Sequence, residues 1–292
     1  MRHAPLLAFW IALVLHGNAQ AQAIPRPEHP RPDAIRSHWM NLNGAWSFRF
    51  DSQNQGLQQR WDQPGAAGFD LTIQVPFCWE SPLSGIHRPD YIGVAWYSRS
   101  FEVPATFPKD QRVWLHFEAV DESATVWVNG RQVVEHEGGY TPFSADITEA
   151  LKPTGQQVLT VRVEDPTSPE HPTGKQVGWY TRTSGLWQTV WLEARPRTAI
   201  DSWTIRTLIE PAQVDLKVVR VGDLTQPATL TARLADPNQT PVTARFEPGS
   251  DRASLVLPIP QPRLWSPESP HLYEMTLELD AGDAGKDQVQ TY

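Results

Sequence analysis

Residues 116–143 read HFEAVDESATVWVNGRQVVEHEGGYTPF and decide the fold. Within this stretch, residues 125–128 (TVWV) alternate so that neighbouring side chains point to opposite faces of a sheet. Asn129 and Gly130 follow, the dipeptide that best tolerates the two positive φ angles of a type I′ turn. Residues 131–134 (RQVV) then run back as a return strand. The stretch therefore predicts a β-hairpin.

The composition indicates a mostly β protein of one large or two ordinary domains. The chain has 292 residues, with 27 Pro and 13 Trp, and Pro favours turns and edge strands over helix interiors. The formal net charge of −8 makes nucleic acid an unsuitable partner, because phosphate binding needs clustered Lys and Arg. This charge fits a neutral substrate, or serves solubility alone.

The N-terminus has the pattern of a secretory signal over residues 1–23. A short basic start precedes an apolar run at 6–15 (LLAFWIALVL), and small residues then allow cleavage after Ala21 or Ala23. The run is about half the ~20 residues that a membrane span requires, which disfavours the alternative of a permanent anchor. We therefore expect a periplasmic or extracellular protein that leaves the membrane after cleavage. Cys78 is the only cysteine, so no internal disulfide is possible.

Two folded parts follow a leader. Residues 24–40 combine Pro with charge, which predicts an extended leader over the surface. Residues 41–197 contain long alternating strands, and the pattern changes near residue 197. Residues 198–292 contain short strands separated by turns, the pattern of an immunoglobulin-like sandwich that would be incomplete at its last strand.

Five motifs carry a family resemblance. They are NLNGAWSFRF (41–50), YIGVAWYSRSF (91–101), GGYTPF (138–143), SGLWQTVWL (184–192) and LWSPESPHLY (264–273). Together they resemble glycoside hydrolase family 2, which contains β-galactosidases, β-glucuronidases and β-mannosidases. The resemblance implies an all-β chain, with a sugar-binding jelly roll of the galactose-binding-like kind followed by the immunoglobulin-like sandwich.

The catalytic part of such a hydrolase is not expected in this chain. The family carries two catalytic Glu residues on a TIM barrel, and the acid/base Glu follows an Asn. This sequence contains no Asn-Glu dipeptide, and a barrel would need about 250 residues beyond Tyr292. We therefore expect no catalytic residue and no activity of the chain alone. No cofactor motif is present, and the nine His lack metal-ligand spacing.

The resemblance also indicates candidate sugar-binding residues. Galactosidases and glucuronidases of the family place an Asp five residues before the small residue of the S/A-G-I element. Counted back from Ser184, that position holds Trp179 here, so galactosidase-type recognition is not implied. The rings of Trp179 and Tyr180 would stack on a sugar face, or else pack in the core or between domains.

Further candidates lie close by in the sequence. Arg88 and Asp90 occupy the position of the other substrate-facing loop of the family and would bind hydroxyls. Arg182 would contact substrate or make a structural ion pair. Polar pairs elsewhere, at Asp121-Glu122 and His136-Glu137, are expected to be structural, with the first pair in a solvated turn.

Three functions fit the sequence. The first is the non-catalytic N-terminal portion of an exported family 2 glycoside hydrolase, whose complete form would hydrolyse terminal β-linked sugars. The second is a stand-alone carbohydrate-binding module. The third is a scaffold for a separate catalytic chain, which would expose a large apolar surface where the barrel docks. Carbohydrate, and a separate or missing barrel domain, are the partners expected.

Overall fold

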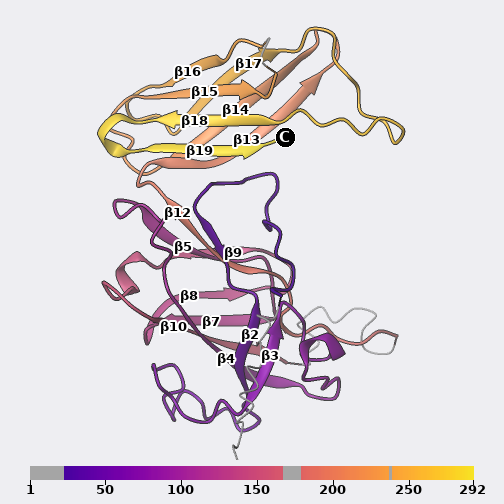
Figure 1. Ribbon diagram of the computed structural model, residues 1–292, viewed down its shortest axis with the longest axis vertical. Helices are drawn as coiled ribbons and strands as arrows, with labels where there is room; N and C mark the ends of the chain where they lie inside the picture. The colour runs from indigo at the N-terminus through magenta and orange to yellow at the C-terminus, as the bar shows by residue number, and fades with distance from the viewer. Residues whose placement is uncertain (1–22, 167–178, 237–238) are drawn as a thin grey trace, which may run out of the picture.

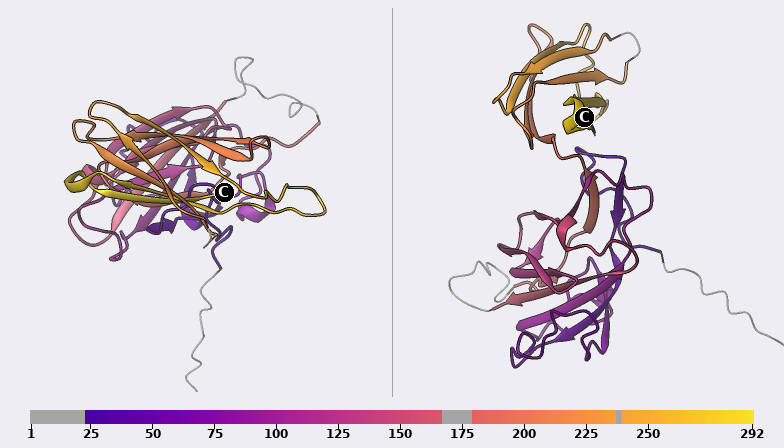
Figure 2. Two further views of the ribbon diagram at one scale, coloured as in Figure 1. Left: turned by 90° about the horizontal axis from the view of Figure 1, so that it is seen from above. Right: turned by 90° about the vertical axis from the view of Figure 1, so that its left-hand side faces the viewer.

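The computed structural model describes residues 23–166, 179–236 and 239–292. The predicted signal peptide therefore lies almost entirely outside the described residues. Figure 1 shows two β units stacked end to end, with the earlier part of the chain below and the yellow C-terminal part above, and the right-hand view of Figure 2 shows the same stacking from the side. The predicted fold class, a jelly roll followed by an immunoglobulin-like sandwich, is confirmed.

The first unit is a sandwich of two main antiparallel sheets. One sheet has four strands in the order β1-β12-β5-β9, and the other has six in the order β3-β2-β4-β10-β7-β8. A two-stranded sheet of β11 and β6 lies at one end. The strands are β1 (Trp39–Asn41), β2 (Gly44–Phe50), β3 (Leu71–Val75), β4 (Gly93–Phe101), β5 (Arg112–Phe117), β6 (Val120–Asp121), β7 (Ser123–Val128), β8 (Arg131–Glu137), β9 (Phe143–Asp146), β10 (Gln157–Asp165), β11 (Gly185–Leu186) and β12 (Val190–Arg195).

The hairpin expected from the opening motif is present. Strands β7 and β8 pair in antiparallel fashion, and Asn129 and Gly130 have φ angles of 53° and 81°. Both angles are positive, as a type I′ turn requires. The Asn129 side chain also donates to the Ala150 carbonyl, at 2.8 Å, which ties the turn to the neighbouring loop.

The second unit is a seven-stranded sandwich. Its sheets have the orders β13-β14-β17 and β16-β15-β18-β19. Alternate residues of β17 and β19 are buried, as expected for strands with one face on a core. The strands are β13 (Ala199–Leu208), β14 (Gln213–Val221), β15 (Ala228–Leu234), β16 (Val242–Phe246), β17 (Arg252–Pro258), β18 (Met275–Asp280) and β19 (Lys286–Thr291).

Helical structure is confined to short 3₁₀ turns among the described residues. These are η1 (Pro82–Ser84), η2 (Thr148–Ala150) and η4 (Gly282–Ala284). Within the three described ranges, no helix has the length and apolar character needed to cross a membrane. The fold is therefore held by two sheet-on-sheet cores, one per unit.

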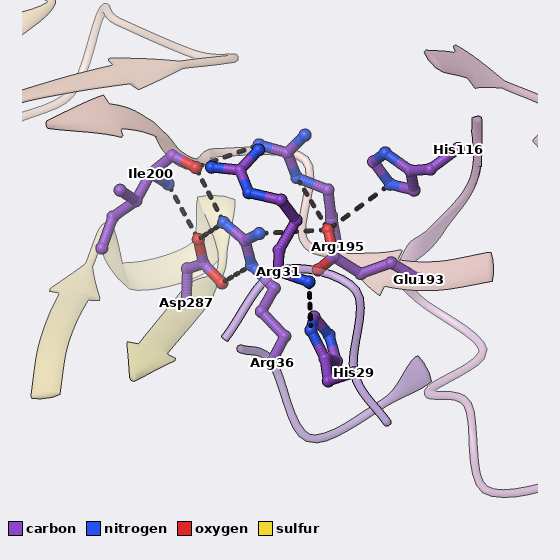
Figure 3. Close-up of polar contacts among 8 residues, drawn as sticks. All are labelled: His29, Arg31, Arg36, His116, Glu193, Arg195, Ile200 and Asp287. Carbon is purple, nitrogen blue, oxygen red and sulfur yellow. Dashed lines mark hydrogen bonds and ion pairs between the residues drawn. The ribbon is translucent and has the colours of Figure 1, made fainter. Parts of the chain in front are cut away.

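The two units are joined by a buried ionic cluster, which Figure 3 shows. Arg36 donates to both carboxylate oxygens of Asp287 on β19, each at 2.8 Å, and to Glu193 Oε1 on β12 at 3.0 Å. Its Nη2 also donates to the Ile200 carbonyl at 2.7 Å. Ile35 and Gln290 exchange two backbone hydrogen bonds of 2.9 Å. The leader thus contacts both units at their junction.

This arrangement corrects the expectation of a leader that only runs over the surface. Arg36 is buried, with 8% of its surface exposed. Burial opposes the charge of Arg36, but its hydrogen bonds to Asp287 and the charge of Glu193 outweigh this and raise its pKa above the usual range. Burial raises the pKa of Glu193, against the opposing charges of Arg36 and Arg195. No local pattern predicts these contacts, because Arg36 and Asp287 are 251 residues apart in the chain.

Candidate functional site

A buried polar cluster lies at the end of the jelly roll where β6 and β11 pair. Ser184 directly precedes β11, and its backbone N–H donates to Glu80 Oε2 at 3.2 Å. Its hydroxyl oxygen lies 2.5 Å from Glu80 Oε1 and also contacts Asp165 Oδ2. Asp165 ends β10 and pairs with Arg182, whose Nη2 lies 2.6 Å from Oδ1. The cluster therefore joins the segment before β11 to two other parts of the unit.

Two glycines allow this close packing. A Cβ at Gly139 would lie 2.5 Å from the carboxyl carbon of Asp121. A Cβ at Gly185 would lie 2.0 Å from the hydroxyl oxygen of Tyr97, and Gly185 has a φ of +85°. Only glycine fits such a position without a shift of the buried neighbours. The second Gly of the GGYTPF motif and the Gly of the SGL motif are thus explained by their close approach to the buried side chains of Asp121 and Tyr97.

The cluster carries more acidic than basic groups. Burial raises the pKa of Asp121 to about 7, and the charges of Asp165 and Glu122 act in the same direction. Burial also raises the pKa of Glu80, although its hydrogen bonds with Ser184 oppose the shift. Near neutral pH, part of the Asp121 population is therefore uncharged.

The candidate aromatic residues stand next to this cluster and face solvent. Trp179 is 84% exposed and Tyr180 is 64% exposed. The alternative that they pack in the core or between the two described units is therefore wrong for both. Arg182, three residues after Trp179, makes the structural ion pair with Asp165. The ion pair therefore connects the segment that carries the two aromatic residues to the end of β10.

The other two candidates form a pair with each other. Arg88 Nε and Nη2 donate to the carboxylate oxygens of Asp90 at 2.9 and 3.1 Å, and both side chains are exposed. The Arg88 backbone N–H donates to the Trp79 carbonyl at 2.8 Å. This hydrogen bond connects the loop that carries Arg88 and Asp90 to Trp79, the residue before Glu80 of the polar cluster.

Several expectations about polar residues are corrected. Asp121 and Glu122 are buried, not solvated, and Asp121 of β6 pairs with Gly185 of β11. Glu80 and Ser184 also belong to the site, and no pattern in the sequence pointed to either as polar site residues. Trp187 is only partly buried and donates from Nε1 to the Gly139 carbonyl at 2.9 Å.

No metal centre is formed by the described residues: in them no three His, Cys, Asp or Glu side chains group as a metal would require. His136 contacts the Gly138 carbonyl and the Thr141 hydroxyl at 3.2 and 3.1 Å, which agrees with its expected structural role. The thiol of Cys78 is partly buried, and burial raises its pKa. A reactive thiolate is therefore not favoured.

Two of the hollows that the described residues form lie at the junction and in the second unit. One, of about 410 Å³, is at the junction and is lined by leader, jelly-roll and second-unit residues that include His116, Glu193 and Trp203. Burial lowers the pKa of His116 to about 3, so this ring is neutral at physiological pH. The other, of about 470 Å³, is an apolar cleft in the second unit, beside exposed Leu264, Trp265 and Leu272.

Comparison with known proteins assigns the family. The model for the sugar binding domain of glycosyl hydrolases family 2 matches residues 39–196, and a second model of glycosyl hydrolases family 2 matches residues 198–292. The two matches cover most of the chain. This protein therefore belongs to glycoside hydrolase family 2, and the resemblance seen in the motifs is confirmed.

Individual relatives agree with this family assignment. A β-glucuronidase of Felis catus is 29% identical over 88% of this chain, and a β-galactosidase of Priestia megaterium is 26% identical over 89%. The solved structure of a Lactobacillus rhamnosus β-glucuronidase superposes with a TM-score of 0.69 at 28% identity. The aligned part is 44% of the cat enzyme, 29% of the Priestia enzyme and 44% of the Lactobacillus chain. The chain thus spans less than half the length of these relatives.

Proposed function

We propose that this chain is the sugar-recognising, non-catalytic front portion of an exported family 2 glycoside hydrolase. The observation that carries the proposal is the exposed Trp179–Tyr180 segment, held at the end of the jelly roll by the Arg182–Asp165 ion pair. Aromatic faces exposed beside carboxylates and a guanidinium suit a pyranose, which has apolar C–H faces and hydroxyls that both donate and accept. The complete enzyme would act on terminal β-linked sugars.

The names of the relatives suggest which sugars to test first. β-Glucuronidases and β-galactosidases both appear among them. A β-glucuronide bears a carboxylate, which Arg88 would attract if its pair with Asp90 opened. A galactoside would depend on the aromatic faces and on hydroxyl contacts. Glucuronic acid and galactose, each with its methyl β-glycoside, are therefore the informative ligands.

Loss of the Trp179 ring is expected to weaken binding. Calorimetric titration of the chain with the four ligands should give saturable binding to at least one of them, and Trp179→Ala should weaken it about two- to tenfold, since an aromatic contact contributes on the order of 0.5–1.5 kcal/mol. Leu57→Ala, at another exposed apolar residue, is the control and should bind as the parent does. Equal binding by parent and Trp179→Ala would remove Trp179 from the site.

A second candidate function is that of a scaffold for a separate catalytic chain. The apolar cleft beside Leu264 and Trp265 favours it. Exposed apolar surface of this kind suits a protein partner. The genomic sequence after codon 292 separates the alternatives. A continuous reading frame for a (β/α)₈ barrel supports the hydrolase portion. A stop codon followed by unrelated sequence supports a binding module, and a barrel encoded as its own gene supports the scaffold.

A further inference from the structure

The contacts of one serine hydroxyl require more hydrogens than that hydroxyl carries. Ser184 Oγ lies 2.5 Å from Glu80 Oε1 and within hydrogen-bond contact of Asp165 Oδ2. A serine hydroxyl has a single hydrogen, and an ionised carboxylate can only accept. If both acids were ionised, one of the two contacts would join two oxygens with no hydrogen between them. One of the two carboxyl groups must therefore carry a proton in this arrangement.

The surroundings decide which acid holds the proton. Asp165 already accepts from the Arg182 guanidinium, whose Nη2 lies 2.6 Å from Oδ1 and 3.2 Å from the Asp165 carbonyl oxygen. Glu80 is buried and makes its polar contacts with Ser184, and the burial raises its pKa. The proton therefore resides on Glu80.

We propose that Glu80, Ser184 and Asp165 form a proton-linked latch that positions the Trp179–Tyr180 segment. The Glu80 carboxyl donates to Ser184 Oγ, the Ser184 hydroxyl donates to Asp165, and Arg182 donates to the other oxygen of Asp165. Ser184 and Arg182 belong to the segment that follows the two aromatic residues. Their contacts with Glu80 and Asp165 join this segment to other parts of the jelly roll. These are positioning residues, and their effect on sugar binding rests on the proposed function.

Loss of the Glu80 proton would open the latch. Two buried carboxylates would then face one hydroxyl hydrogen, so one contact would be lost and the two negative charges would repel. Because the pKa of Glu80 is raised in the closed form, closure is fully favoured below the ordinary pKa of a glutamic acid. It is lost as the pH rises through the raised value.

Other titratable groups face Glu80, and the effect of their titration must be distinguished from the effect of titrating Glu80. Burial raises the pKa of both the Cys78 thiol and the Tyr97 phenol, so these two stay uncharged below their ordinary values. The remaining charged neighbours are Asp165 and Arg182, which form the pair described above, with Asp121 and Glu122 beyond them. Asp121 titrates near pH 7 and therefore needs a control of its own.

Hydrogen exchange of the amides of Ser184 and Leu186 tests the latch. The first donates to Glu80 Oε2 at 3.2 Å and the second to the Tyr97 hydroxyl at 3.4 Å. After correction for the intrinsic pH dependence of exchange, we expect the protection in the parent chain to be lost between pH 5 and pH 9, as Glu80 gives up its proton. Glu80→Gln places an amide donor where the protonated carboxyl stands, and should keep its protection across this range.

Two further variants complete the test. Asp121→Asn removes the neighbouring titration and should still lose protection as the pH rises, whereas Ser184→Ala should have low protection at every pH. A pH-independent parent, or a Glu80→Gln variant that loses protection as the parent does, would overturn the latch. Sugar titrations at pH 5 and pH 9 give an independent readout. Absence of sugar binding with the exchange result intact would refute the proposed function and leave the latch standing.

Discussion

Arg36→Met is expected to lower the free energy of unfolding by about 3–5 kcal/mol, because it removes the cationic partner of buried Asp287 and leaves buried Glu193 with Arg195 alone, whose Nε lies 3.6 Å from Glu193 Oε1. At roughly 2–4 °C per kcal/mol for units of this size, the melting temperature should fall by about 10 °C. Asp287 would keep only its bond from the Ile200 N–H, at 2.8 Å. Because the cluster joins the two units, calorimetry should also show them unfolding in separate transitions.

The matched control is Arg245→Met. Arg245 forms an exposed pair with Glu247, 3.8 Å apart, and exposed pairs of this kind contribute about 0–1 kcal/mol. Its melting temperature should therefore stay close to that of the parent. An Arg36→Met variant that melts with the parent, in a single transition, would show that the ionic cluster does not hold the units together.

Gly185→Ala should destabilise the jelly roll by about 3 kcal/mol or more. A left-handed backbone costs a residue with a Cβ about 1–2 kcal/mol, and overpacking against a fixed core adds about 1–3 kcal/mol. Here the new Cβ would lie 2.0 Å from the Tyr97 hydroxyl oxygen and 3.0 Å from the Trp79 ring, both fully buried. Thermal melting followed by near-ultraviolet circular dichroism would measure the loss.

Gly155→Ala separates the two contributions. Gly155 has a φ of +77°, close to that of Gly185, but a Cβ there would meet nothing within 4 Å. Only the backbone cost of about 1–2 kcal/mol is expected at this position. If the two variants were equally stable, the close approach to Tyr97 would not matter, and the packing of β11 onto the core would need another explanation.

Local patterns predicted the local structure well. The Asn129-Gly130 turn, the alternation in β7 and the short strands of the second unit each depend on residues near in sequence, so the sequence alone sufficed to predict them. The family motifs then predicted the order of the two sandwiches. Whether Trp179 is exposed could not be predicted, because its exposure depends on what packs against its segment, and no local pattern determines this.

The polar contacts that organise the site and the junction were not predictable in this way. Asp121 and Glu122 look like turn charges in the sequence, and they become buried only when β11 pairs with β6 from 64 residues further along the chain. Ser184 meets Glu80 across 104 residues, and Arg36 meets Asp287 across 251. Such pairs have no spacing rule, so only the assembled fold reveals them.

The function proposed for this chain is to recognise a sugar without hydrolysing it. To test this, the purified chain is incubated with 4-nitrophenyl β-D-glucuronide and 4-nitrophenyl β-D-galactopyranoside, while the same preparation is titrated with the corresponding methyl glycosides. We expect saturable binding of at least one glycoside and no release of nitrophenol above the rate without protein. Nitrophenol release that scales with the concentration of the chain and survives further purification would contradict it.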